Sequence, residues 1–219
     1  MKHNYKKITI ISGEYGSGKT NLALNMITDI RKSGKTAAII DLDIVNPYFR
    51  TADYTEELSA AGIDVIQPDF ACSNLDIPVL NFDVERIINT HDHTVIDVGG
   101  SDAGAFALGR YKKVFEKLAG EYDLLYVFNM YRSVEASPRQ TAELLCEIEK
   151  ACSLKCTGLV NNSNLGSETT PGIIDASSDF AEKISELSGL PIVFRCVSEN
   201  MTPETGDFPV CRKVKTIWE

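Results

Sequence analysis

Eight residues near the start of the chain, Gly13 to Thr20 (GEYGSGKT), match the pattern G-x-x-x-x-G-K-[ST] in full. The apolar run Lys7 to Ser12 precedes them and a helix-like stretch follows, which is the context that a phosphate-binding P-loop requires. We expect Lys19 to contact the outer phosphates and the Thr20 hydroxyl to ligate Mg²⁺. The predicted nucleotide-binding residues of this segment are Gly13, Glu14, Tyr15, Gly16, Ser17, Gly18, Lys19, Thr20 and Asn21.

Short apolar runs alternate with longer helix-like stretches along the whole chain. Strands are predicted at 7–12, 36–42, 64–67, 94–98, 124–128, 157–161 and 192–195, and helices around 20–32, 79–89, 106–118, 137–152 and 176–187. Because each parallel crossover needs about a dozen intervening residues, this alternation predicts an α/β fold. We expect one P-loop domain over residues 1–219, with a mostly parallel sheet and helices on both faces.

Two acidic motifs follow predicted strands, at the sheet edge where open parallel sheets bind ligands. They are Asp41-Leu42-Asp43 and Asp97-Val98-Gly99-Gly100. Asp97 closes an apolar strand and could hold Mg²⁺ through its water shell, while Gly100 would let the backbone approach a γ-phosphate. The first motif is also compatible with a polar turn capped by aspartates.

The P-loop and both acidic motifs together resemble the MinD/ParA group of P-loop ATPases, the CobQ/CobB/MinD/ParA nucleotide-binding domains, over most of the chain. The resemblance implies ATP and Mg²⁺ as ligands and ATP hydrolysis as the activity. It implies that Lys19 and Asp43 are catalytic, Asp43 by orienting the hydrolytic water. Thr20, Asp41 and Asp97 would serve the metal, Gly100 with Asp97 would sense the γ-phosphate, and Asn162 would meet the base.

Glu14 departs from the group's pattern, G-K-G-G-x-G-K-[ST], in which this position is a lysine that reaches the partner's phosphates in a nucleotide-sandwich dimer. A carboxylate about 6 Å from phosphate would be repelled by roughly 3 kcal/mol per unit charge at an effective dielectric near 20. We therefore expect Glu14 to point away from the phosphates or to pair with a cation such as Arg50 or Arg132. A nucleotide-dependent homodimer is compatible with the sequence only if another cation replaces the lysine.

The base is predicted from the stretch Asn161-Asn162-Ser163-Asn164-Leu165. Guanine-specific P-loop proteins usually carry N-K-x-D after a late strand, and the aspartate grips the guanine edge. The stretch has no aspartate. ATP is therefore favoured over GTP.

The charge of the chain limits its partners. With 22 basic and 31 acidic residues the net charge is −9, so binding of nucleic acid or of an anionic membrane is not expected. No apolar run approaches the roughly 18 residues of a membrane span, and the first apolar run is too short for a cleaved signal peptide, so we expect a cytoplasmic location. Six cysteines without a C-x-x-C pair argue against a disulfide framework and a zinc ribbon.

Three hypotheses about function remain open. The first is a slow ATPase that acts as a nucleotide-driven switch for a protein partner. The second is an ATP-dependent enzyme acting on a small-molecule carboxylate, resembling dethiobiotin synthetase or the cobyrinate amidation enzymes, which commonly lack the same lysine. The third is a nucleotide-binding adaptor without turnover, against which the presence of Asp43 argues.

Overall fold

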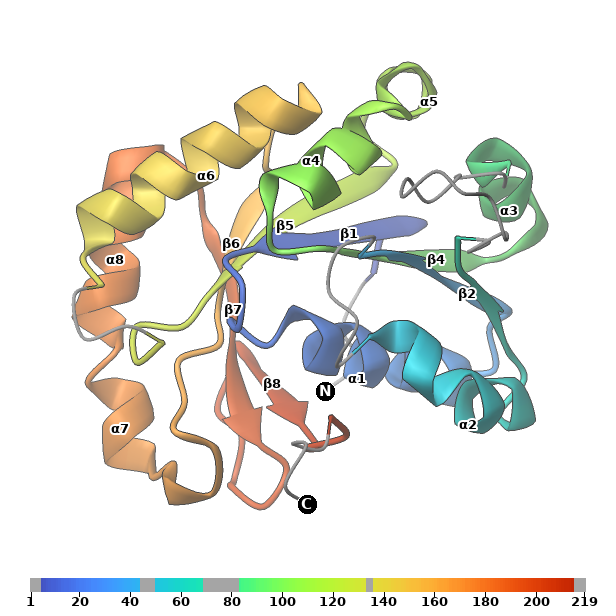
Figure 1. The fold of residues 1–219 in the computed structure, drawn as a ribbon. Helices are drawn as coiled ribbons and strands as arrows, with labels where there is room; N and C mark the ends of the chain where they lie inside the picture. Colours follow the sequence, from blue (N-terminus) through green and yellow to red (C-terminus); the bar gives the residue numbers. More distant parts are fainter. Residues whose placement is uncertain (1–4, 44–49, 69–82, 133–135, 215–219) are drawn as a thin grey trace, which may run out of the picture.

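One eight-stranded sheet organises the computed structural model of this chain, which describes residues 5–43, 50–68, 83–132 and 136–214 (Figure 1). The strand order is β3-β2-β4-β1-β5-β6-β7-β8, and all pairings are parallel. The predicted α/β fold is confirmed. The strands are β1 (Ile8–Gly13), β2 (Ala37–Leu42), β3 (Ile63–Ile66), β4 (His93–Val98), β5 (Tyr122–Phe128), β6 (Gly158–Asn161), β7 (Ile192–Ser198) and β8 (Asp207–Val210).

Helices cover both faces of the sheet, as Figure 1 shows. One face packs against α1 (Lys19–Lys32) and α2 (Thr55–Ala60). The other face packs against α3 (Val84–Thr90), α4 (Asp102–Gly109), α5 (Lys112–Lys117), α6 (Pro138–Cys152) and α8 (Ser178–Ser188). A short helix, α7 (Pro171–Asp175), and two 3₁₀ turns, η1 (Thr51–Tyr54) and η2 (Gly166–Glu168), complete the elements. The central strands are therefore buried on both sides, which explains their continuous apolar sequences.

The central strands divide their side chains between two cores. Ile8 and Ile10 of β1 belong to the core under α4 and α6, whereas Ile11 belongs to the core under α1. Every residue of β1 and of β2 is buried. The carboxyl ends of these strands are consequently held rigidly, and the loops that follow them start from fixed positions.

The structure corrects several predicted elements. The helix predicted over 106–118 is two helices, since α4 ends at Gly109 and α5 begins at Lys112. The chain passes close to α6 at this break, where a Cβ on Gly109 would lie 3.2 Å from the Ala151 carbonyl oxygen. The first residues of the helix predicted at 79–89 lie outside the described residues. We did not predict α2, α7 or β8. The last is an edge strand of four residues containing Pro209, which periodicity cannot distinguish from a loop.

Candidate nucleotide-binding site

The predicted P-loop joins the end of β1 to the start of α1, in the centre of the sheet. Gly16 and Gly18 have φ angles of 77° and 88°, in the left-handed region that glycine adopts without strain. The Ser17 N–H donates to the Glu14 carbonyl oxygen at 3.2 Å and closes the turn. The loop therefore takes a path that depends on its glycines, and it ends at the amino terminus of a fourteen-residue helix, where anions are favoured.

Lys19 lies beneath this loop and is only 7% exposed. Its Nζ donates to the Glu14 carbonyl oxygen at 2.8 Å. Burial lowers the pKa of Lys19, and the nearby carboxylates of Asp97, Asp43 and Glu14 oppose that shift. The ammonium group is thus held against the backbone of the loop itself. Lys19 would have to break this hydrogen bond in order to contact an outer phosphate.

Asp97 contributes a buried carboxylate to the site. It is 1% exposed, and its Oδ2 accepts a hydrogen bond from the Thr51 hydroxyl at 2.9 Å. The Thr20 hydroxyl lies near this carboxylate. Among the described residues, Asp97 Oδ1 has no hydrogen-bond partner. Burial, reinforced by the charge of Asp41, raises the pKa of Asp97 to about 7. An orphaned carboxylate oxygen beside a threonine hydroxyl is an arrangement that fits Mg²⁺, a hard cation with oxygen ligands.

Asp41 lies directly beside Asp97, because the two residues are register partners on β2 and β4. It is fully buried and accepts backbone N–H groups from Asp43 at 2.9 Å and Ala52 at 3.2 Å. Its Oδ2 also lies 3.5 Å from Arg50 Nε. Burial raises the pKa of Asp41, although Arg50 and the two N–H groups favour its charged form. Since both of its oxygens already have partners, Asp41 is placed beside Asp97 to support the metal site and not to bind a metal ion directly.

Two glycines bring the segment after β4 against the P-loop and the Asp41-Leu42-Asp43 motif. A Cβ on Gly99 would lie 2.8 Å from Asp43 Oδ1, and a Cβ on Gly100 would lie 2.7 Å from both Lys19 Nζ and the Tyr15 backbone nitrogen. No side chain fits at either position without displacing its neighbours. The three motifs singled out from the sequence are therefore in contact with one another.

Asn162 follows β6 and contacts the P-loop from the other side. Its Nδ2 donates to the Ser17 carbonyl oxygen at 2.6 Å, and a Cβ on Gly18 would lie 2.3 Å from the same Nδ2. A cavity of about 220 Å³ opens here. Its lining comes from the P-loop, α1, the segment after β6, α7, β7, β8 and the C-terminal segment. The lining residues are Gly18, Asn21, Asn162, Asn164, Gly166, Thr169, Ile174, Cys196, Val197, Ser198, Val210, Arg212 and Val214.

Asn21 occupies a different environment from the phosphate loop. Its side chain donates to the Cys211 carbonyl oxygen at 3.1 Å and accepts the Lys213 N–H at 2.8 Å. The side chain therefore ties the C-terminal segment to α1. Its side-chain amide forms these structural bonds, and a role in nucleotide binding stays a prediction.

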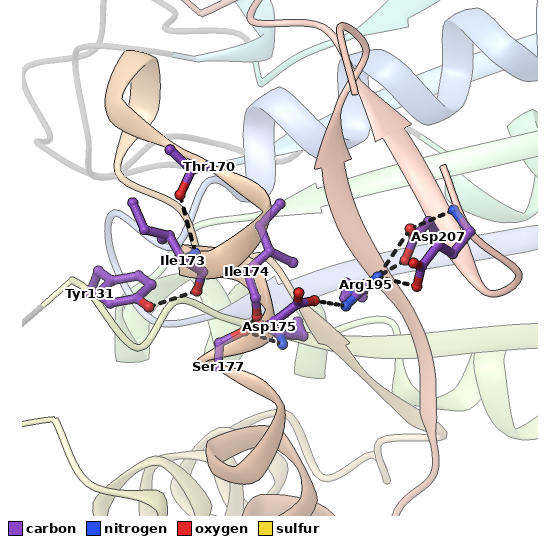
Figure 2. A network of polar contacts seen from close by, with 10 residues as sticks. Tyr131, Thr170, Ile173, Ile174, Asp175, Ser177, Arg195 and Asp207 are labelled. Carbon is purple, nitrogen blue, oxygen red and sulfur yellow. Dashed lines mark hydrogen bonds and ion pairs between the residues drawn. The ribbon is translucent and has the colours of Figure 1, made fainter. Parts of the chain in front are cut away.

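A polar network that we did not predict joins α7, β7 and β8, three elements that contribute residues to the lining of this cavity (Figure 2). Arg195 bonds Asp207 at 2.7 Å and Asp175 at 2.9 Å, which joins β7 to β8 and to α7. The Tyr131 hydroxyl donates to the Ile173 carbonyl oxygen at 2.7 Å. These partners are 12 to 42 residues apart in the chain, so no local pattern could have revealed them.

Glu14 and Arg132 have locations that the sequence did not determine. Glu14 lines a cavity against α6, and no ion pair among the described residues includes it. Arg50 pairs with Asp41, so the suggested Arg50–Glu14 pair is wrong. Arg132 Nε donates to the Tyr15 carbonyl oxygen at 3.1 Å and would lie 2.0 Å from a Cβ on Gly16. The guanidinium group therefore lies directly on the P-loop.

The fold and this site together define a nucleotide-binding protein of the P-loop class. The chain belongs to the CobQ/CobB/MinD/ParA nucleotide binding domain family, whose model matches residues 8–168. No curated protein matches the sequence. Among the described residues, no helix has the length and apolar character needed to cross a membrane.

Several solved structures share this fold. The signal recognition particle receptor FtsY from Elizabethkingia anophelis, in complex with GDP, has a TM-score of 0.60 at 14% identity, over 90% of this chain and 59% of that one. FtsY from Mycoplasma mycoides has a TM-score of 0.55 at 19% sequence identity, over 90% of this chain and 63% of that one. The 54 kDa signal recognition particle protein from Aeropyrum pernix, in complex with GDP, has a TM-score of 0.55 at 14% sequence identity, over 89% of this chain and 42% of that one. The chain thus spans less than two thirds of each.

Proposed function

We propose that this protein binds ATP with Mg²⁺ and hydrolyses it slowly, as a nucleotide-driven switch for a protein partner. The observation that carries the proposal is the buried Asp97 carboxylate, which lies near the Thr20 hydroxyl and the Lys19 ammonium group. Its Oδ1 has no hydrogen-bond partner in the part of the chain that the structure describes. An uncompensated carboxylate in a fully buried position costs stability, and it is retained most readily where a cation completes it.

Each residue of the site has a separate proposed role. Lys19 exchanges the Glu14 carbonyl oxygen for the outer phosphates of the nucleotide. Thr20 and Asp97 would hold Mg²⁺, with Asp41 behind them, and the bound cation would neutralise charge that develops on the phosphates. Asp43 orients the attacking water, and the backbone at Gly100, which lies against Lys19, approaches the γ-phosphate.

The lining of the base cavity supports adenine. None of the described residues around it carries a carboxylate that could bond the N1–H and amino group of guanine. Asn164 lies in the wall, but its amide is already engaged, since Nδ2 donates to the Asn162 carbonyl oxygen at 2.7 Å and Oδ1 accepts the Gly166 N–H at 3.0 Å. The solved structures with GDP share only the fold with this chain, so they do not indicate its nucleotide. We therefore keep ATP as the proposed nucleotide.

Arg132 replaces the lysine that the family carries at the position of Glu14, because it brings a positive charge to the P-loop. Its guanidinium carbon lies 5.6 Å from the centre of the Tyr15 ring, over the exposed side of the loop. Stacked on the ring and bonded to the Tyr15 carbonyl oxygen, the charge is held at the P-loop without any second subunit. We infer that it stabilises charge on the phosphates within the same chain.

Nucleotide titration tests the proposal. The dissociation constants of fluorescent ATP and GTP analogues are measured with Mg²⁺ and with EDTA, for the parent, Lys19→Ala and Asp97→Ala, with exposed Glu121→Gln as control. We expect ATP to bind more tightly than GTP, and each site variant to lose at least about tenfold in affinity, as for a lost charge-assisted hydrogen bond. Equal affinity of parent and site variants would refute the site, and tighter GTP binding would refute the base assignment.

One observation favours a second candidate, an ATP-dependent enzyme of small-molecule metabolism. Glu14 replaces the lysine that a switch dimer would use, and it lines a cavity against α6. This candidate predicts that ADP release is stimulated by a carboxylate substrate, whereas the switch predicts slow release that no metabolite accelerates. A panel of carboxylic acids with coupled ADP detection separates the two.

A further inference from the structure

The apolar lining of the cavity beside Asn162 comes from the C-terminal part of the chain. Up to Gly166, the chain contributes only asparagines and glycines to this lining. The apolar lining residues are Ile174, Cys196, Val197, Val210 and Val214. All five lie beyond residue 168, where the match to the family model ends. The surface on which a base would pack is therefore built by a part of the chain that the family model does not match.

The C-terminal segment, residues 211–214, forms one side of this cavity. It follows β8 directly and contributes Arg212 and Val214 to the lining. Val214 also packs against the core under α1. Lys213 Nζ forms an ion pair with Glu57 of α2 at 3.0 Å. The segment therefore contacts both the cavity and the helix layer that begins at the P-loop.

Two asparagines of α1, one helical turn apart, hold the backbone of this segment. Asn25 Nδ2 donates to the Cys211 carbonyl oxygen at 2.8 Å, and Asn25 Oδ1 accepts the Cys211 N–H at 2.8 Å. Asn21 Oδ1 accepts the N–H groups of Lys213 at 2.8 Å and of Val214 at 3.2 Å. Side chains four residues apart lie on one face of a helix, so both amides meet the segment together. These bonds fix the path of the backbone independently of the side chains that the segment carries.

The location of these two asparagines relates the base cavity to the phosphate loop. Asn21 directly follows Thr20, the residue proposed to ligate Mg²⁺, and Asn25 lies one turn further along α1. The same helix would therefore set the distance between the phosphates and the wall that contacts the base. A wall that is ordered before the ligand arrives lowers the entropy cost of binding.

We propose that Asn25 is a positioning residue for the base of the bound nucleotide, because it holds the C-terminal segment as a preformed wall of the base cavity. The inference rests on the proposed function, since it requires that the cavity beside Asn162 receives the base. It adds that affinity for the base, unlike affinity for the phosphates, depends on a segment outside the family match. Without the anchor, residues 211–214 would move away from the cavity, whereas the P-loop would keep its own hydrogen bonds.

Calorimetric titration of the full chain with Mg-ATP and with magnesium triphosphate tests the proposal, because the two ligands share the phosphates and only one carries a base. The variant is Asn25→Ala, which removes both bonds to Cys211 and introduces a good helix former. The matched control is Thr28→Ala on the same helix, since the Thr28 hydroxyl donates to the Leu24 carbonyl oxygen within α1 at 2.6 Å. Amide hydrogen exchange of the parent over residues 207–214, with each ligand, is a second measurement that needs no variant.

We expect Asn25→Ala to weaken Mg-ATP about fivefold and magnesium triphosphate less than about twofold, while Thr28→Ala changes each less than about twofold. In the parent, ATP should slow exchange over residues 207–214 more than triphosphate does, and this comparison decides if Asn25→Ala does not fold.

Equal losses for the two ligands in Asn25→Ala, or an unchanged affinity for ATP, would overturn the proposal. Equal protection of residues 207–214 by the two ligands would also overturn it. In each of these cases the parent still binds ATP, so the proposed function survives. A parent that binds neither ligand would refute the proposed function and this inference together. If the parent prefers GTP, the base assignment fails and the same comparison is made with Mg-GTP.

Discussion

Asp97→Asn should make the ligand-free protein more stable while it weakens Mg-nucleotide binding. The asparagine keeps an oxygen that accepts from Thr51, and it removes a buried charge beside Asp41. The pKa of Asp97 is about 7 in the folded chain against 3.8 as its ordinary value. At ~1.4 kcal/mol per pKa unit, ionisation costs the folded state about 4 kcal/mol above pH 7.

The sign of the pH dependence follows from the direction of this shift. Between pH 4 and 7 the folded state binds the proton that the unfolded state has lost, so stability falls as the pH rises through that window. The neighbouring Asp41 titrates together with Asp97, so we expect the variant to recover about half of the cost, ~2 kcal/mol, at pH 8. At pH 4 the difference should nearly vanish.

Urea unfolding in EDTA at pH 4, 6 and 8 measures this difference, with Asp102→Asn, an exposed acid, as the control. A slope of ~2 to 3 kcal/mol per molar urea converts the gain into a midpoint shift of roughly 0.7 to 1 M at pH 8. A variant that is no more stable than the parent at pH 8, or one with the same gain at all three pH values, would refute the reasoning about the buried charge.

Three further predictions concern the contacts around the loop. Gly100→Ala should weaken Mg-ATP binding at least about tenfold by titration, because its Cβ would meet Lys19. Gly172→Ala should not, because its Cβ would meet only Thr170 Oγ1, at 4.0 Å. Arg132→Ala should lower the single-turnover hydrolysis rate about 100-fold with a smaller change in affinity; an unchanged rate would exclude it as the replacing cation. Asn162→Ala should cost ~1 kcal/mol in thermal unfolding through its bond to Ser17, and an unchanged midpoint would contradict that.

Much of the site follows from local pattern. A complete P-loop between an apolar strand and a helix, with acids closing two other strands, predicts the fold class and the edge of the sheet at which a ligand would bind. The family match over residues 8–168 confirms the resemblance. The sequence did not predict elements with little periodicity, such as β8. Asp207 of β8 pairs with Arg195 of β7, a contact that the local sequence does not reveal.

The sequence by itself determined the strand and helix alternation, the phosphate-binding loop and the two acidic motifs, because these depend on residues close together in the chain. Only the tertiary structure decided how they act. It buried Asp97 beside Asp41, which raises its pKa, and it turned Glu14 toward α6 and laid Arg132 on the P-loop. Burial and charge pairing are sums over neighbours from distant segments, so they exist only after the sheet has assembled.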